Sequence, residues 1–190
     1  MPRIARKPRA APKALTTSRT RAVSKIRTAS KSRARSKNKA RVTLDIRIES
    51  DLWNRARNVK ALARRAIVEA ASVAAESRCE VAVLLTDDPS IRVINADWRG
   101  VDAPTNVLSF PAPQTEGDRP FLGDIVLAFE TIAAEARAEG KPFAHHFAHL
   151  CVHGFLHLLG YDHVRKKDAE VMEAAERAIL RRLLIPDPYG

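Results

Sequence analysis

The most informative stretch of the sequence is HGFLHLLGYDH, His153–His163. His153 and His157 are four residues apart, which on an α-helix places them about 40° apart on one face and roughly 6 Å apart along the axis. Two imidazoles in this arrangement can chelate one metal ion. A continuing helix would carry His163 about 9 Å further, but Gly160 is a natural left-handed helix stop that lets the chain turn back. The stretch therefore predicts a helix near the C-terminus with three histidines converging at its end.

Three neutral imidazoles are a common zinc ligand set in enzymes, with one position left open for water. The same spacing occurs in the metzincin proteases, H-E-x-x-H-x-x-G-x-x-H, where the glutamate is the general base. This chain has Gly154 at that position. We therefore interpret the stretch as the site of one zinc ion in a metal hydrolase other than a protease. A chance histidine pair on an apolar helix is the alternative, and the third histidine and the glycine stop argue against it.

The composition allows one ordinary domain with a tail. The chain has 190 residues and is 45% hydrophobic, enough for a proper core. Cys79 and Cys151 form no C-x-x-C motif, so no disulfide framework is indicated and a reducing compartment fits. No run of 18 apolar residues and no apolar signal-peptide core is present. We therefore expect a cytoplasmic protein without a membrane partner.

The positive charge is concentrated at the N-terminus. Residues 1–40 hold 14 of the 33 Lys and Arg and none of the 22 Asp and Glu, so residues 41–190 carry a net charge of −3. A basic segment without apolar periodicity cannot bury enough surface to order itself, so we predict that 1–40 is a disordered extension. It could be an RNA-binding arm, an organellar transit peptide or a dispensable extension.

Strands and helices alternate in the remaining sequence, residues 41–190. Alternation of apolar and polar residues predicts a first strand over 42–48, and a serine at position 50 could cap one long helix to residue 78. The pattern predicts further strands at 80–86, 106–110 and 122–129. It predicts helices at 88–98, 142–159 and 167–184, and one more that follows the last strand and ends at residue 140. This order indicates a single α+β domain, a small mixed sheet of about four strands packed with helices.

Other histidines and an aspartate lie near the proposed ligands. His149 extends the four-residue spacing backwards, and helix drift gives it a role behind the ligands or in packing, whereas His145 and His146 are expected at the surface. Asp162 could orient an imidazole or form a turn, and the sequence favours neither.

Two charged residues stand out elsewhere. Asp124 lies in an apolar strand, so it either has a buried partner, such as a ligand histidine or an arginine, or points to solvent. Arg99 could bind a phosphate near a metal, although an isolated arginine is more often a surface residue.

Several stretches together resemble the YbeY family of endoribonucleases, which are rRNA maturation factors. They are the histidine stretch at 153–163, TNVLSFP at 105–111, LGDI at 122–125 and WRG at 98–100, in the same order along the chain. The resemblance covers about residues 41–185, and the basic extension lies outside it.

The resemblance implies a zinc-dependent hydrolase of single-stranded RNA that acts in 16S rRNA 3′-end maturation and ribosome quality control. Its partners would be rRNA and the small ribosomal subunit. By motif position, His153, His157 and His163 would be the metal ligands and members of the catalytic site. Arg99 would contact the substrate phosphate.

The residues leave parts of the mechanism open. Zinc can lower the pKa of water and polarise a phosphoryl oxygen, and attack by that water on the phosphodiester is our hypothesis. The base could be the metal hydroxide itself, or Asp162 or Asp124 acting through water, and attack by the ribose 2′-OH is an alternative. A zinc peptidase and a non-catalytic assembly factor with structural zinc are the competing functions. The sequence does not predict an oligomeric state.

Overall fold

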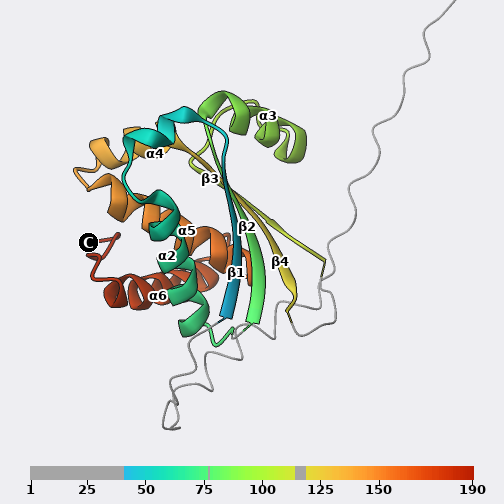
Figure 1. The fold of residues 1–190 in the computed structure, drawn as a ribbon. Helices are drawn as coiled ribbons and strands as arrows, with labels where there is room; N and C mark the ends of the chain where they lie inside the picture. Colours follow the sequence, from blue (N-terminus) through green and yellow to red (C-terminus); the bar gives the residue numbers. More distant parts are fainter. Residues whose placement is uncertain (1–40, 77, 114–118) are drawn as a thin grey trace, which may run out of the picture.

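The computed structural model describes residues 41–76, 78–113 and 119–190. The extension predicted at 1–40 lies outside the described residues. In chain order the elements (Figure 1) are β1 (Arg41–Ile48), the short 3-10 helix η1 (Asp51–Arg55), α2 (Val59–Val73), β2 (Arg78–Thr86), α3 (Asp88–Arg99), β3 (Val107–Pro111), β4 (Phe121–Ala128), α4 (Phe129–Ala138), α5 (Phe143–Leu158) and α6 (Lys166–Arg182).

The four strands form one mixed sheet in the order β1-β2-β4-β3. β1 is parallel to β2 and β2 is parallel to β4, whereas β3 pairs antiparallel with β4. β3 is therefore one of the two sheet edges. The predicted α+β fold, with a mixed four-stranded sheet in a single domain and a histidine-bearing helix near the C-terminus, is confirmed.

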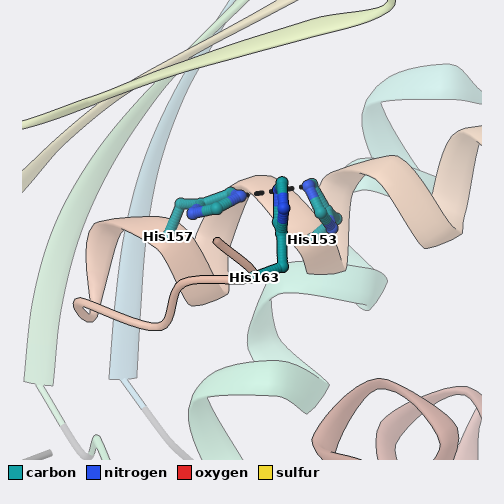
Figure 2. A group of neighbouring side chains, drawn as sticks. All are labelled: His153, His157 and His163. Atoms are coloured by element: carbon teal, nitrogen blue, oxygen red, sulfur yellow. Dashed lines mark hydrogen bonds between the residues drawn. The ribbon is translucent and has the colours of Figure 1, made fainter. Parts of the chain in front are cut away.

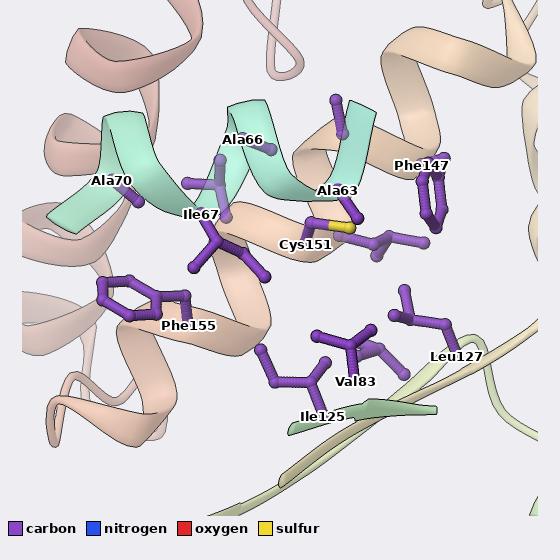
Figure 3. Close-up of a cluster of buried hydrophobic side chains, with 14 of the residues drawn as sticks. Ala63, Ala66, Ile67, Ala70, Val83, Ile125, Leu127, Phe147, Cys151 and Phe155 are labelled. Carbon is purple, nitrogen blue, oxygen red and sulfur yellow. The ribbon is translucent and has the colours of Figure 1, made fainter. Parts of the chain in front are cut away.

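Helices cover both faces of the sheet unequally. On one side α2 and α5 pack against the strands and against each other, with α6 behind them, while α3 lies on the opposite side (Figure 1). α2 presents small, fully buried residues to α5, which lets the two helices approach closely. Figure 3 shows this layer, with Ala63, Ala66 and Ala70 of α2 beside Cys151 and Phe155 of α5.

Strand alternation divides the residues of β4 between two cores. Ile125 and Leu127 face the main core under α5, whereas Val126 and Ala128 join Ile91 of α3 in a smaller core on the opposite face. Both faces are therefore covered, which explains the nearly continuous apolar run of β4.

The predicted single helix from residue 50 to residue 78 is wrong. Ser50 does accept the backbone N–H of Leu52, but it begins η1, and Asn58 then adopts a left-handed conformation with φ 57° before α2 starts. Trp53 explains the interruption, because its side chain is buried and its Nε1 donates to Thr86 O at 2.8 Å. The chain bends so that this indole can fill the end of the core.

Gly123 in the LGDI stretch allows β3 and β4 to pair closely. Its φ is 136°, and a Cβ at this position would lie 2.1 Å from the backbone oxygen of Phe110. No other residue fits here without moving β3.

None of the helices in the described parts of the chain combines the length and the apolar character that spanning a membrane would need.

Candidate metal centre

Three histidines converge at the C-terminal end of α5, as the sequence predicted. His153 and His157 project from the helix, and His163 reaches them from the segment that follows (Figure 2). The ring centroids of His153 and His157 are 4.6 Å apart. The ring centroid of His163 lies 5.4 Å from that of His153 and 5.0 Å from that of His157. One ring nitrogen from each residue lies within 4.8 Å of the others, so the three could hold one metal ion.

A glycine stop and an aspartate turn bring His163 back to the helix. Gly160 has φ 85°, and the N–H of Tyr161 donates to Leu156 O at 3.0 Å, which closes the helix end. The Asp162 carboxylate then accepts the backbone N–H groups of His163 at 2.8 Å and Val164 at 3.3 Å. Asp162 therefore forms the turn, one of its two predicted roles.

The outer ring nitrogens fix the tautomers of the helical pair. His153 Nδ1 lies 2.8 Å from Glu176 Oε1, and His157 Nδ1 lies 3.0 Å from the carbonyl oxygen of Tyr161. Both partners are acceptors, so each Nδ1 carries the proton and each neutral ring has a bare Nε2. These two Nε2 atoms face each other at 3.1 Å. Burial, and the repulsion that a charged His157 would meet from a charged neighbouring histidine, lower the pKa of His157 to about 4, so that ring is neutral at pH 7.

This donor set fits a metal ion. Two bare nitrogen lone pairs at 3.1 Å repel each other unless a cation lies between them. Tetrahedral zinc with bonds near 2.0–2.1 Å separates two ligand nitrogens by about 3.3 Å. The tautomers and the spacing of His153 and His157 therefore suit a tetrahedral metal ion such as zinc, and the exposed His163 could supply a third nitrogen.

Glu176 of α6 is the residue at this centre that the sequence analysis missed. Its side chain is fully buried, and its carboxylate accepts hydrogen bonds from His149 Nε2 at 3.0 Å, His153 Nδ1 and the Tyr189 hydroxyl. Burial alone would raise the pKa of Glu176, but the hydrogen bonds from both histidines and Tyr189 outweigh it and lower the pKa to about 2. A fixed negative charge therefore stands directly behind His153.

A signal for Glu176 was present in the sequence. It lies between Met172 and Ile179 on the apolar stripe of α6, where the other positions are buried hydrophobic residues. A charged residue on such a stripe needs a buried partner, and the nearest polar groups are the histidines of α5.

His149, His153 and Glu176 form a second group whose atoms lie close enough to share a metal. Hydrogen bonds account for this proximity, because the carboxylate accepts N–H groups from both rings. In the group of His153, His157 and His163, by contrast, the Nε2 lone pairs of His153 and His157 face each other without a hydrogen between them. His149 therefore lies behind the ligand pair, as predicted.

The prediction that His146 lies at the surface is wrong. His146 is buried, and its Nε2 lies 2.7 Å from Glu135 Oε2 of α4, a carboxylate that also accepts the Asn106 amide. This contact ties α4 and α5 to the start of β3. His145, by contrast, is partly exposed.

Gly154 faces the sheet. A Cβ here would lie 3.0 Å from Ile125 Cγ2 and 3.1 Å from Ser109 Oγ. The position that carries a glutamate in metzincins is therefore packed against β3 and β4, with no room for a carboxylate side chain.

The structure does not bring the two remaining candidates into direct contact with the histidines. Asp124 is exposed on β4, so the alternative that it points to solvent is the one observed. Arg99 is the last residue of α3 and is exposed, and none of the hydrogen bonds or ion pairs found in the described parts of the chain involves its side chain.

The fold and the site define an α+β protein with a three-histidine candidate metal centre. A family model described as Endoribonuclease YbeY matches residues 45–184. Endoribonuclease YbeY of Rhodopseudomonas palustris (strain BisB18) is 51% identical over 153 residues, covering 77% of this chain and 91% of the relative. Endoribonuclease YbeY of Bradyrhizobium diazoefficiens is 53% identical over 154 residues, covering 77% and 84%. The chain belongs to the YbeY endoribonuclease family.

Proposed function

We propose that this protein is a zinc-dependent endoribonuclease that cleaves single-stranded RNA during maturation of the small-subunit 16S rRNA 3′ end and in ribosome quality control. The observation that carries the proposal is the facing pair of bare Nε2 atoms of His153 and His157, with His163 beside them. Membership of an endoribonuclease family supplies the substrate class. The proposed setting is the cytoplasm, with the small ribosomal subunit as partner.

In this proposal each site residue has a separate task. His153, His157 and His163 hold the ion, with the first two oriented by Glu176 and the Tyr161 carbonyl. The bound ion supplies an activated water and a positive charge beside the phosphoryl group. Arg99 binds a phosphate of the RNA substrate.

The packing of Gly154 against β3 and β4 supports RNA rather than peptide cleavage. A peptidase with this histidine spacing uses a glutamate at this position as its base. Because that position is buried, hydrolysis of the phosphodiester would rely on a water activated by the metal and on Arg99. Products with a 2′,3′-cyclic phosphate would reject attack by water in favour of attack by the ribose 2′-OH.

The test combines metal analysis with cleavage of a single-stranded RNA by wild type, Arg99→Ala and Arg92→Ala. Arg92 is the matched control, because it is an exposed arginine of the same helix that is already paired with Asp102. We expect one zinc per chain in all three proteins and a loss of cleavage, about 100-fold, only in Arg99→Ala. Stoichiometric zinc without cleavage in any protein would instead indicate a non-catalytic assembly factor, and cleavage of casein would indicate a peptidase.

A further inference from the structure

The end of α3 exposes an unusually large aromatic side chain. Trp98 is 74% exposed, whereas Trp53, the second tryptophan of the chain, is 1% exposed. An indole presents more apolar surface than any other side chain. Leaving it in water forfeits the stabilisation that burial would give, so its exposure calls for an explanation.

A second aromatic ring supports this indole from below. The ring of Phe110 in β3 lies 5.3 Å from that of Trp98, with an interplanar angle of 54°. Phe110 is itself half-buried and packs against the small core beneath α3. The contact joins two stretches far apart in the sequence, WRG and TNVLSFP. It holds the indole in place while most of its surface stays open to solvent.

The residue after Trp98 is an arginine that has no ionic partner among the described residues. Arg92 is neutralised by a bidentate pair with Asp102, at 2.6 and 2.9 Å. Arg99, adjacent to Trp98, forms no ion pair or hydrogen bond with any side chain that the structure describes. Trp98 and Arg99 are both exposed at the C-terminal end of α3, so this end of the helix offers one contact for a flat ring and one for an anion.

The aromatic pair and the metal centre lie on opposite faces of the same sheet edge. Val107 and Ser109 of β3 pack against α5 at Gly154. Gly154 lies between His153 and His157 in the sequence of that helix. Phe110 follows Ser109, and alternation along the strand turns its ring to the other face. Because β3 is an edge strand, one flexible chain could pass over it and touch both sites.

We propose that Trp98, supported by Phe110, is a stacking platform for an unpaired base of the single-stranded RNA substrate, with Arg99 on an adjoining phosphate. This inference rests on the proposed function. Base–aromatic stacking tolerates any base, so the platform would contribute affinity for single strands without sequence preference. A base paired within a duplex cannot stack on it.

Tryptophan fluorescence tests the platform directly, because Trp98 is the exposed one of two tryptophans. The zinc-loaded protein is titrated with a short 2′-O-methyl oligouridylate, and KM and kcat are measured on single-stranded RNA. The variants are Trp98→Ala, Trp98→Phe and, as a matched exposed apolar residue of α3, Val93→Ala.

We expect the oligonucleotide to quench the wild-type fluorescence, and Trp98→Ala to weaken binding and raise KM roughly 5- to 150-fold with little change in kcat. Trp98→Phe should retain most of the affinity, and Val93→Ala should match wild type. If the protein cleaves RNA but the oligonucleotide does not quench its fluorescence and Trp98→Ala leaves KM unchanged, the platform is refuted and the proposed function stands. That result would be expected if Trp98 is a docking site for another protein. Absence of cleavage in every protein would refute the proposed function instead.

Discussion

Replacing Glu176 by glutamine should weaken zinc binding without displacing the histidines. Glutamine keeps an oxygen that can accept the His153 Nδ1–H but removes the negative charge behind the ligand. The 2.8 Å hydrogen bond and the width of an imidazole place that charge about 6–7 Å from an ion on Nε2. At an effective dielectric constant near 20 the direct attraction is then about 5 kcal/mol, an upper limit, because water and neighbouring dipoles compensate part of it.

Losses of this kind at other zinc sites are about 10- to 100-fold in metal affinity, or roughly 1.4–2.7 kcal/mol. We expect the same range here. The assay is competition for zinc against a chromophoric chelator at pH 7, with circular dichroism to verify folding. Glu173→Gln is the control, because Glu173 lies on the same helix and pairs with Arg177 instead. An unchanged zinc affinity in a folded Glu176→Gln protein would refute the role of this charge.

Three further predictions follow from the packing and the pKa values. Gly154→Ala should lower the free energy of unfolding by about 1–3 kcal/mol in urea denaturation, because the added methyl group meets Ile125 and Ser109; unaltered stability would mean that the contact is not tight. The metal-free protein should lose stability as the pH falls, first between about pH 6.5 and pH 4, because His157 becomes protonated there in the unfolded chain but not in the folded one. A second loss should follow from about pH 4.5 toward pH 2, where Glu176 becomes protonated in the unfolded chain before it does in the folded one. A melting temperature that is constant from pH 7 to pH 3 would contradict both pKa shifts. The thiols of Cys79 and Cys151 are fully buried, and burial raises the pKa of each, so neither should react with iodoacetamide at pH 8 until the protein unfolds; rapid modification of the native protein would contradict this.

The sequence predicted those features of the fold that depend on local patterns. The alternation in β1 and the histidine spacing on α5 reflect the periods of a strand and a helix. The glycine stop at Gly160 follows from the left-handed conformation that glycine tolerates. These signals need no knowledge of the rest of the molecule, and they placed the three histidines together.

The features that the sequence analysis missed depend on contacts between distant segments. The break at Asn58 follows from the burial of Trp53 against β2, and the burial of His146 depends on Glu135 from another helix. Glu176 becomes meaningful only once α6 is known to pack behind α5. The pairing of Trp98 with Phe110 likewise requires the strand order, which places β3 at the edge beneath α3.

The most direct test is a zinc titration of the metal-stripped protein, with the rate of single-stranded RNA cleavage measured at each addition. If His153, His157 and His163 hold one catalytic ion, the rate rises in proportion to added zinc and saturates at about one equivalent per chain. Full cleavage by the stripped protein, or stoichiometric zinc uptake with no cleavage, would contradict a catalytic metal at these three histidines.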